Sequence, residues 1–196
     1  GVMIKTGIYG ILRMLTLIQT PTKLMCYMVL IISAITFLYG ILYAVSQNDI
    51  KKMLAYSSIE NIGIIGAGIG IGMIGLYYNN FAVAFIGFAG GILHTLNHSI
   101  FKELLFFSAG NIYTKTHTRN MELLGGLAKS MPKSAGLFLI GAAAICGLPP
   151  FNGFVSEILI YYGMLKGLAI GNFFNFIILM FVFSGLAFVG TMAILC

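Results

Sequence analysis

Charge is scarce in this sequence. Only 8% of its 196 residues are Asp, Glu, Lys or Arg, whereas 59% are hydrophobic. A soluble domain carries about 25% charged residues, so this composition excludes an ordinary soluble domain and indicates a membrane protein. Glycine is abundant instead, with 25 residues, as is typical of transmembrane helices that pack closely. The net charge of +6 is better explained by membrane topology than by nucleic-acid binding.

Cysteine is also rare, and its pattern excludes several kinds of site. The three cysteines, Cys26, Cys146 and Cys196, are scattered in apolar runs and form no C-x-x-C pair. Neither iron–sulfur nor zinc ligation is indicated, and an odd count gives no disulfide framework. The sequence therefore predicts no cofactor and no metal in this chain.

An initiator methionine and a recognisable secretory signal are absent as well. The sequence begins at Gly1 within one apolar segment and stops at Cys196 within another. We therefore expect it to be an internal piece of a larger polytopic protein.

The apolar runs predict an all-α fold, a polytopic transmembrane helical bundle. Residues 1–18 are read as the end of a preceding helix. The span 81–110, at about 45 Å, exceeds a hydrocarbon core of about 30 Å, which predicts a tilt or a local break, most obviously at Gly90–Gly91. The predicted spans are 24–45, 53–76, 81–110, 134–162 and 172–196.

The fourth of these spans contains the signal for a discontinuous helix. Pro149 and Pro150 remove backbone donors near its middle, and Gly153 follows, which predicts two half-helices separated at 148–153. Irregular backbone at membrane depth is tolerated only inside protein or beside a wet cavity, and its freed carbonyls should meet polar side chains or water. Glu157, two turns later, then indicates an ion or proton site. The alternative is a proline kink used for packing, with Glu157 near an interface.

A glycine motif in the second span is misleading. Gly70–Gly75 fits G-x-G-x-x-G, but a dinucleotide site needs a preceding strand and an acid about twenty positions later, where Thr95 stands. The surrounding glycines follow a small-x-x-x-small spacing. This spacing predicts helix packing.

Three titratable residues follow one another on the third span. His94, His98 and Lys102 are spaced i, i+4, i+8, so they share one helix face and rise by roughly 12 Å. Such a row can hand a proton along through water, because histidine titrates near neutrality. Ser57, Ser58, Thr95 and Asn97 are candidates to hold those waters.

Other interpretations of this row stay open. H-x-x-x-H on a helix can bind a metal, but the sequence shows no H-E-x-x-H glutamate and no obvious third ligand. Haem ligation fails because His94 and His98 on one helix face cannot take opposite sides of one iron. Buried structural histidines are the remaining alternative. Glu103, beside Lys102, points to a different face and is a candidate counter-charge for a neighbouring helix.

Glu60 is a further carboxylate inside a predicted span. It lies about two turns into 53–76, where an unpaired charge is costly, so it must find a partner or face water. One alternative is a structural acid bonded to nearby hydroxyls or to a neighbouring helix. The other is an accessory group of the relay, for which Ser57 and Glu103 are further candidates.

Basic residues predict the topology. Lys51, Lys52, Lys115, Arg119, Lys129 and Lys133 fall in or beside the loops 46–52 and 111–133. The opposite side carries only Lys23 and Lys166. The positive-inside rule therefore places the loops 46–52 and 111–133 in the cytoplasm.

Four stretches together resemble a known family. They are LAYSSIENIG at 54–63, LHTLNHSIFK at 93–102, THTRNMELLGGL at 116–127 and GLPPFNGFVSE at 147–157. The chain resembles the antiporter-like, proton-translocating subunits shared by respiratory complex I, Mrp-type sodium/proton antiporters and membrane-bound hydrogenases. The SIENIG form at 58–63 and the THTRN-x-E-x-LGG form at 116–126 look most like the large antiporter-like membrane subunit of formate hydrogenlyase and hydrogenase-4.

The resemblance implies a fold and a set of roles. Residues 24–196 match the second of two inverted five-helix repeats. Lys5 matches the lysine that links two half-channels, and His94, His98 and Lys102 match the central relay. Glu157 matches the outer titratable residue, whereas Glu103 departs from the small residue common at its position. The family's input glutamate and its paired lysine belong to the first repeat and are absent here.

The function implied is a proton-translocating subunit of a membrane oxidoreductase of the hydrogenase-4 or formate hydrogenlyase type. Its partners would be other membrane subunits and a peripheral iron–sulfur/nickel–iron or NADH-oxidising arm, which would hold the redox centres. It would lie in the inner (cytoplasmic) membrane. The alternatives are an Mrp-type cation/proton antiporter subunit, a NADH–quinone oxidoreductase antiporter-like subunit, and a membrane scaffold whose polar row no longer conducts.

Overall fold

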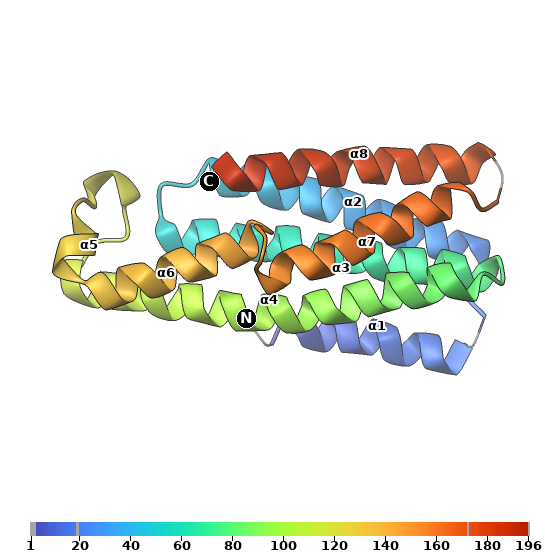
Figure 1. The fold of residues 1–196 in the computed structure, drawn as a ribbon, viewed down its shortest axis with the longest axis horizontal. Helices are drawn as coiled ribbons and strands as arrows, with labels where there is room; N and C mark the ends of the chain where they lie inside the picture. The colour runs from blue at the N-terminus through green and yellow to red at the C-terminus, as the bar shows by residue number, and fades with distance from the viewer. Residues whose placement is uncertain (1–2, 19, 172, 196) are drawn as a thin grey trace.

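The computed structural model describes residues 3–18, 20–171 and 173–195, and these residues form helices joined by short connections (Figure 1). The predicted all-α fold is confirmed, because no strand occurs in the described ranges beyond one isolated bridge. Gly1 and Cys196, at the ends of the first and last predicted spans, lie outside the described residues. The helices are α1 (Lys5–Ile18), α2 (Lys23–Val45), α3 (Ile50–Tyr77), α4 (Phe81–Thr116), the 3₁₀ turn η1 (Met121–Leu123), α5 (Leu127–Ser130), α6 (Pro132–Ile145), α7 (Asn152–Leu168) and α8 (Phe173–Leu195).

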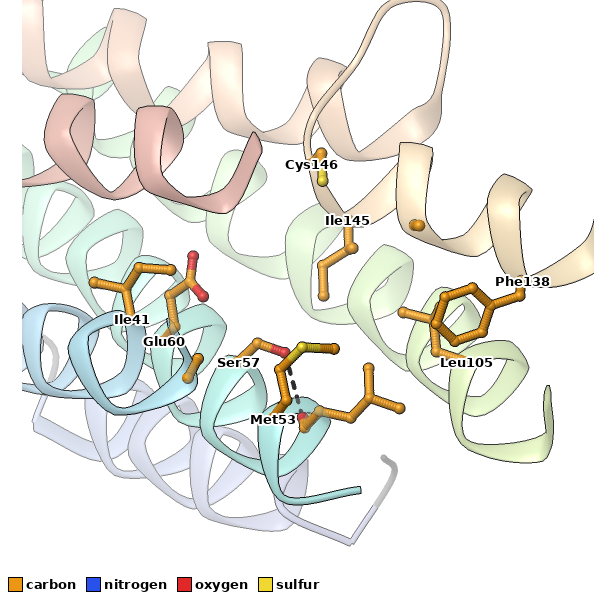
Figure 2. Close-up of a pocket in the computed structure, with 11 residues that line it drawn as sticks. Ile41, Met53, Ser57, Glu60, Leu105, Phe138, Ile145 and Cys146 are labelled. Carbon is orange, nitrogen blue, oxygen red and sulfur yellow. Dashed lines mark hydrogen bonds between the residues drawn. The ribbon is translucent and has the colours of Figure 1, made fainter. Parts of the chain in front are cut away.

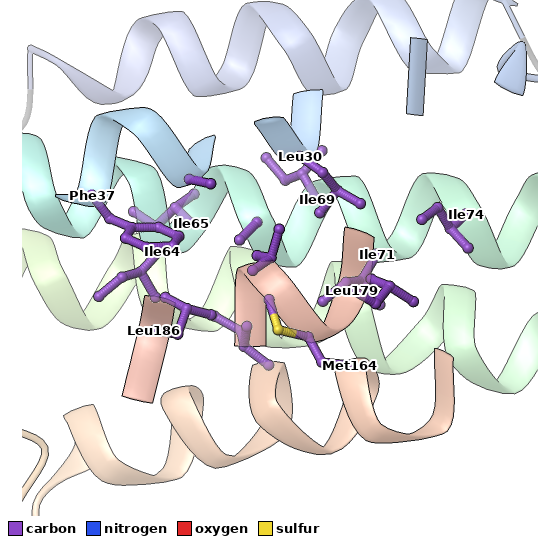
Figure 3. Packing of buried hydrophobic residues seen from close by; sticks show 14 of the residues in the cluster. Leu30, Phe37, Ile64, Ile65, Ile69, Ile71, Ile74, Met164, Leu179 and Leu186 are labelled. Carbon is purple, nitrogen blue, oxygen red and sulfur yellow. The ribbon is translucent and has the colours of Figure 1, made fainter. Parts of the chain in front are cut away.

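The long helices run along the long axis of the molecule (Figure 1). By length and composition, α2, α3 and α4 are each apolar enough to cross a membrane, while α6 and residues 175–187 of α8 are shorter apolar helices. Helix α3 packs against α2, α4 and α7, and α8 closes the bundle over α2 and α7. Figure 3 shows the apolar core that results, in which Phe37, Ile65 and Leu186 meet from α2, α3 and α8.

Glycines set the spacing around α3. A Cβ atom on Gly75 would lie 2.2 Å from the backbone nitrogen of Ala84, and one on Gly72 would lie 2.7 Å from the Phe88 ring. On the other side of α3, a Cβ on Gly70 would lie 2.7 Å from Leu30. The glycines of the G-x-G-x-x-G stretch therefore bring helices together, as predicted from their spacing.

Helix α4 is longer and more regular than predicted. It continues without interruption from Phe81 to Thr116, a run of 36 residues. The expected break at Gly90–Gly91 is wrong, because these glycines serve packing. A Cβ atom on Gly90 would lie 2.9 Å from Ile160 of α7, so a larger residue would push α7 away from α4.

The discontinuous helix is present, with slightly different limits from those predicted. Helix α6 ends at Ile145 and α7 begins at Asn152, and the two lie end to end (Figure 1). Pro149 and Pro150 lie exposed in the irregular segment. The carbonyls of Ala143 and Ala144 accept hydrogen bonds from backbone N–H groups of the turn rather than from the polar side chains that we expected.

Gly153 belongs to the first turn of α7 and not to the break. It is buried, and a Cβ atom there would lie only 2.0 Å from the carbonyl oxygen of Ala144. Gly153 therefore lets the start of α7 rest against the end of α6.

The other end of α7 also differs from the prediction. The helix extends to Leu168 rather than to residue 162, and Lys166 lies in its last turn. The Lys166 ammonium sits 5.5 Å from the centre of the Tyr162 ring. An exposed lysine in the last turn of a helix was thus mistaken for part of a loop.

The loops 46–52 and 111–133 lie at the same end of the bundle, as predicted. Asp49 and Asn120 form a β-bridge, and the Ile50 amide donates to the Arg119 carbonyl at 3.1 Å. The Asn48 side-chain amide donates to Glu122 Oε1 at 3.0 Å. These contacts tie the start of α3 to the long connection after α4.

Candidate functional site

The three titratable residues of α4 face the interior of the bundle. His94, His98 and Lys102 each have a relative exposure of 0%. Their spacing places them on the face of α4 that packs on α3 and α7, as the sequence predicts. The two imidazole rings stack with 6.4 Å between their centres.

His94 is held on both sides. Its Nε2 lies 3.0 Å from Asn61 Oδ1 on α3, and its Nδ1 lies 2.9 Å from Ser156 Oγ on α7. Asn61 Nδ2 donates to the Ser57 carbonyl at 2.8 Å, which fixes the amide so that its oxygen faces His94. His94 Nε2 must therefore carry a hydrogen, since an amide oxygen only accepts.

The Ser156 hydroxyl then depends on the charge of His94. Neutral His94 has a bare Nδ1, to which Ser156 donates. Protonated His94 donates from Nδ1 to Ser156 Oγ, and the hydroxyl hydrogen turns to the Gly153 carbonyl, 2.9 Å away. The charge of His94 is thus communicated to the first turn of α7, beside the break.

Asn97 makes a second connection between α4 and α7. Its side-chain nitrogen donates to the Asn152 carbonyl at 2.9 Å and to Ser156 Oγ at 3.2 Å. Asn152 Nδ2 returns a hydrogen bond to Asn97 Oδ1 at 3.1 Å. Sequence reasoning missed Asn61, Asn152 and Ser156. The sequence did hold a signal for them, because each is a polar residue directly beside a titratable or helix-breaking residue.

His98 has a different environment. Both of its ring nitrogens are buried, and neither has a hydrogen-bond partner in the described part of the chain. The ring packs edge-on against Phe101, with 5.4 Å between centres. Because buried imidazole nitrogens are ordinarily hydrogen-bonded, water is the natural partner for His98.

Lys102 crosses from α4 to α3. Its ammonium donates to the Leu54 carbonyl at 2.9 Å and to the Ser57 hydroxyl. Ser57 was expected to hold a water and instead contacts the lysine directly. A fully buried ammonium thus keeps two oxygen partners on the neighbouring helix.

Three acidic residues surround the row at different distances from the interior. Glu60 has a relative exposure of 4% and lines a cavity of about 100 Å³ together with Ser57 (Figure 2). Glu157 is half-buried, and its carboxylate points back towards the break. Its Oε2 lies so close to Gly147 that a Cβ atom added there would be only 2.6 Å away. Glu103 is exposed and points away from the row, as predicted.

Lys5 lies on α1 at the level of the row. Its relative exposure is 8%, and its charge acts electrostatically on His94, His98 and Lys102. Glu103 is the acid whose charge acts on Lys5. Lys5 is therefore brought to the same region of the bundle as His94, His98 and Lys102, while Glu157 lies on α7 beside Gly147 of the break.

A metal site fits this arrangement poorly. Both ring nitrogens of His94 already face protein hydrogen-bond partners, so a metal would have to displace Asn61 or Ser156. Within the described ranges, no group of three His, Cys, Asp or Glu side chains is placed to hold an ion.

Comparison with known proteins identifies the family. The family described as NADH:quinone oxidoreductase/Mrp antiporter, transmembrane, matches residues 1–187. The chain belongs to this family. The resemblance seen in the four sequence stretches is therefore confirmed.

Individual members of this antiporter-like family are similar over most of the chain. "Hydrogenase-4 component B" of Escherichia coli (strain K12) is 45% identical over 160 residues, which cover 80% of this chain and 24% of that protein. "Formate hydrogenlyase subunit 3" of the same strain is 37% identical over 195 residues, which cover 100% of this chain and 32% of that protein. The solved Mrp complex from Dietzia sp. DQ12-45-1b matches with a TM-score of 0.69 and 25% identity, over 86% of this chain and 28% of that one.

The chain thus spans about a quarter to a third of the length of these antiporter-like relatives. The match to the Mrp structure covers 86% of this chain, so the helical membrane fold is that of the family.

Proposed function

We propose that this chain is part of a proton-translocating membrane subunit of an oxidoreductase of the hydrogenase-4 or formate hydrogenlyase type. The observation that carries the proposal is the buried row His94, His98 and Lys102, with Lys5 and Glu157 beside it. Charged side chains inside a membrane protein are costly and mark ion or proton paths when they share one interior. Every member of this row can bind or release a proton.

The row supports transfer by short steps. His94 exchanges hydrogen bonds with Ser156 according to its charge, His98 lies between His94 and Lys102, and Lys102 reaches α3. A proton on Lys102 passes towards Glu157, and Lys5 stands at the opposite limit of the row. The chain is then the second repeat of the subunit, and its redox partners hold the cofactors.

The partners we propose are other membrane subunits and a peripheral arm that holds iron–sulfur and nickel–iron or NADH-oxidising centres. The relatives whose names contain hydrogenase-4 and formate hydrogenlyase support this choice. A second candidate is an Mrp-type cation/proton antiporter, in which sodium is exchanged for protons, and the Mrp structural match favours it.

Copurification separates the two candidates. The full-length protein is tagged in its own host, extracted in mild detergent, and its complex is analysed for metals. We expect iron and nickel, or iron with a bound flavin, to copurify in fixed ratio. A complete complex without redox metals that exchanges sodium for protons would support the antiporter instead.

We also propose that the protein lies in the cytoplasmic (inner) membrane with loops 46–52 and 111–133 in the cytoplasm. In a background with the native cysteines replaced, Lys166→Cys should react in intact cells with a membrane-impermeant maleimide. Lys129→Cys should react only after lysis, because six of the eight assigned basic residues lie at its end of the bundle. The reverse labelling pattern would contradict this orientation.

Ser156→Ala should slow proton transfer while leaving assembly unchanged. The substitution removes the group that accepts from protonated His94, a loss of about 1.5–3 kcal/mol for a hydrogen bond to a charge, or roughly 10- to 100-fold in rate. Proton uptake by vesicles containing the intact complex measures the effect.

Ser99→Ala is the matched control for this experiment. Its hydroxyl donates only to the Thr95 carbonyl of its own helix, at 2.9 Å. Equal rates for Ser156→Ala and Ser99→Ala would contradict the role given to Ser156.

A further inference from the structure

Glu60 is fixed in place by the close approach of two helices. A Cβ atom on Gly40 of α2 would lie 2.3 Å from the Glu60 nitrogen and 2.9 Å from its Cβ. The α2 backbone therefore occupies the space on that side of Glu60. The carboxylate extends instead into the cavity between α2, α3, α4 and α6 (Figure 2).

The carboxylate of Glu60 lacks a hydrogen-bond partner among the groups that the structure describes. No described side chain or backbone group makes a hydrogen bond or ion pair with its oxygens, although the residue has a relative exposure of only 4%. Lys102 on α4 and Glu157 on α7 act on it electrostatically. A buried carboxyl group without a protein partner requires water, which the cavity can supply.

The cavity joins Glu60 to the row through one hydroxyl group. Its volume of about 100 Å³ is enough for several waters, since one occupies about 30 Å³ of liquid. Ser57 lines it next to Glu60 and also accepts the hydrogen bond from Lys102. Water between Glu60 and Ser57 would complete a hydrogen-bonded path to the lysine.

The same cavity meets a second one that opens at the loop end of the bundle. The second cavity, of about 410 Å³, is lined by the polar residues Gln47, Asn48 and Glu122 and by apolar residues that include Val45 and Met121. Ala44 and Met53 line both cavities. The two cavities therefore adjoin at Ala44 and Met53, which offers a route from the loops 46–52 and 111–133 to Glu60.

We propose that Glu60 carries protons between the loop side of the bundle and Lys102. The neutral carboxylic acid gives its proton through water to the neutral Lys102 amine, which leaves a carboxylate and an ammonium. A proton from the solvent at the loop side, relayed along water past Met53, then reprotonates the carboxylate and leaves the water molecules unchanged. This side entrance rests on the proposed proton-transferring function, and it reaches Lys102 without passing through Lys5 or His94.

The first test is Glu60→Gln in the intact complex, reconstituted in vesicles and assayed for proton uptake. Glutamine keeps the shape of the side chain but cannot cycle a proton, so we expect uptake to fall at least tenfold. Glu60→Asp keeps the carboxyl group in the cavity and should retain most of the rate. Normal uptake in Glu60→Gln together with loss in Lys102→Ala would overturn the side entrance and leave the proposed function standing.

The second test examines the route and keeps Glu60 unchanged. In a background with the native cysteines replaced, Met53→Cys is treated from the loop side with a charged methanethiosulfonate reagent. Blocking this position should slow proton uptake several-fold. Ser130→Cys, exposed at the same end but outside both cavities, is the control and should be modified without effect. Full uptake by complexes with quantitatively modified Met53→Cys would overturn the route.

Discussion

Gly153→Ala is expected to disrupt both the stability and the transport of the intact protein. The new methyl group would lie 2.0 Å from the Ala144 carbonyl oxygen, and its three nearest atoms all belong to backbone, so no flexible side chain can move aside. Overpacking of this kind costs about 1–3 kcal/mol or more, because α6 and α7 must separate. The shift would also carry Asn152 and Ser156 away from Asn97 and His94.

Gly136→Ala is the matched control for the same measurement. Gly136 lies in α6, and an added Cβ there would have nothing within 4 Å. Thermal unfolding of the purified complex should show a lower midpoint for Gly153→Ala than for Gly136→Ala, and proton uptake should fall only in the former. Equal midpoints and equal uptake would contradict the role of Gly153 as the contact between the half-helices.

Features that depend on local sequence could be predicted. Two adjacent prolines remove consecutive backbone donors, so the break between α6 and α7 was evident. The i, i+4, i+8 spacing of His94, His98 and Lys102 sets their common face in any helix. The location of the loops 46–52 and 111–133 on the same side of the membrane followed from the two predicted spans between them.

Features that depend on contact between helices far apart in the sequence could not be predicted. The role of Ser156 requires α7 to lie against α4, and the role of Asn61 requires α3 to face His94. The pair Gly90–Gly91 is typical of a helix break, but in the fold α7 and α3 pack closely against the two glycines of an unbroken α4. Glu60 stayed ambiguous because its environment is a cavity shared by four helices.

Lys102→Ala should abolish proton transfer. Lys102 is the titratable group that continues the histidine row on α4 and donates to the carbonyl of Leu54 on α3, so its loss interrupts the path. The fold should persist, since alanine is well tolerated in a helix and the change removes a buried charge. Lys102→Met, which keeps much of the side-chain length without a titratable group, should behave in the same way.

The matched control is Lys115→Ala on the same helix. Lys115 is exposed and donates to the Ser130 carbonyl at the loop end, at 2.8 Å, so its removal takes away a charge outside the row. Both variants should assemble with their partners to the same extent, which detergent extraction and size-exclusion chromatography measure.

Proton uptake in vesicles tests the central claim that the buried row carries protons. Complexes with wild-type protein, Lys102→Ala, Lys102→Met and Lys115→Ala are reconstituted at equal density and driven by the same redox turnover or ion gradient. The account predicts uptake in the wild type and in Lys115→Ala, and none above background in both Lys102 variants. Wild-type uptake in fully assembled Lys102→Ala complexes would contradict it and leave the row a structural feature of the bundle.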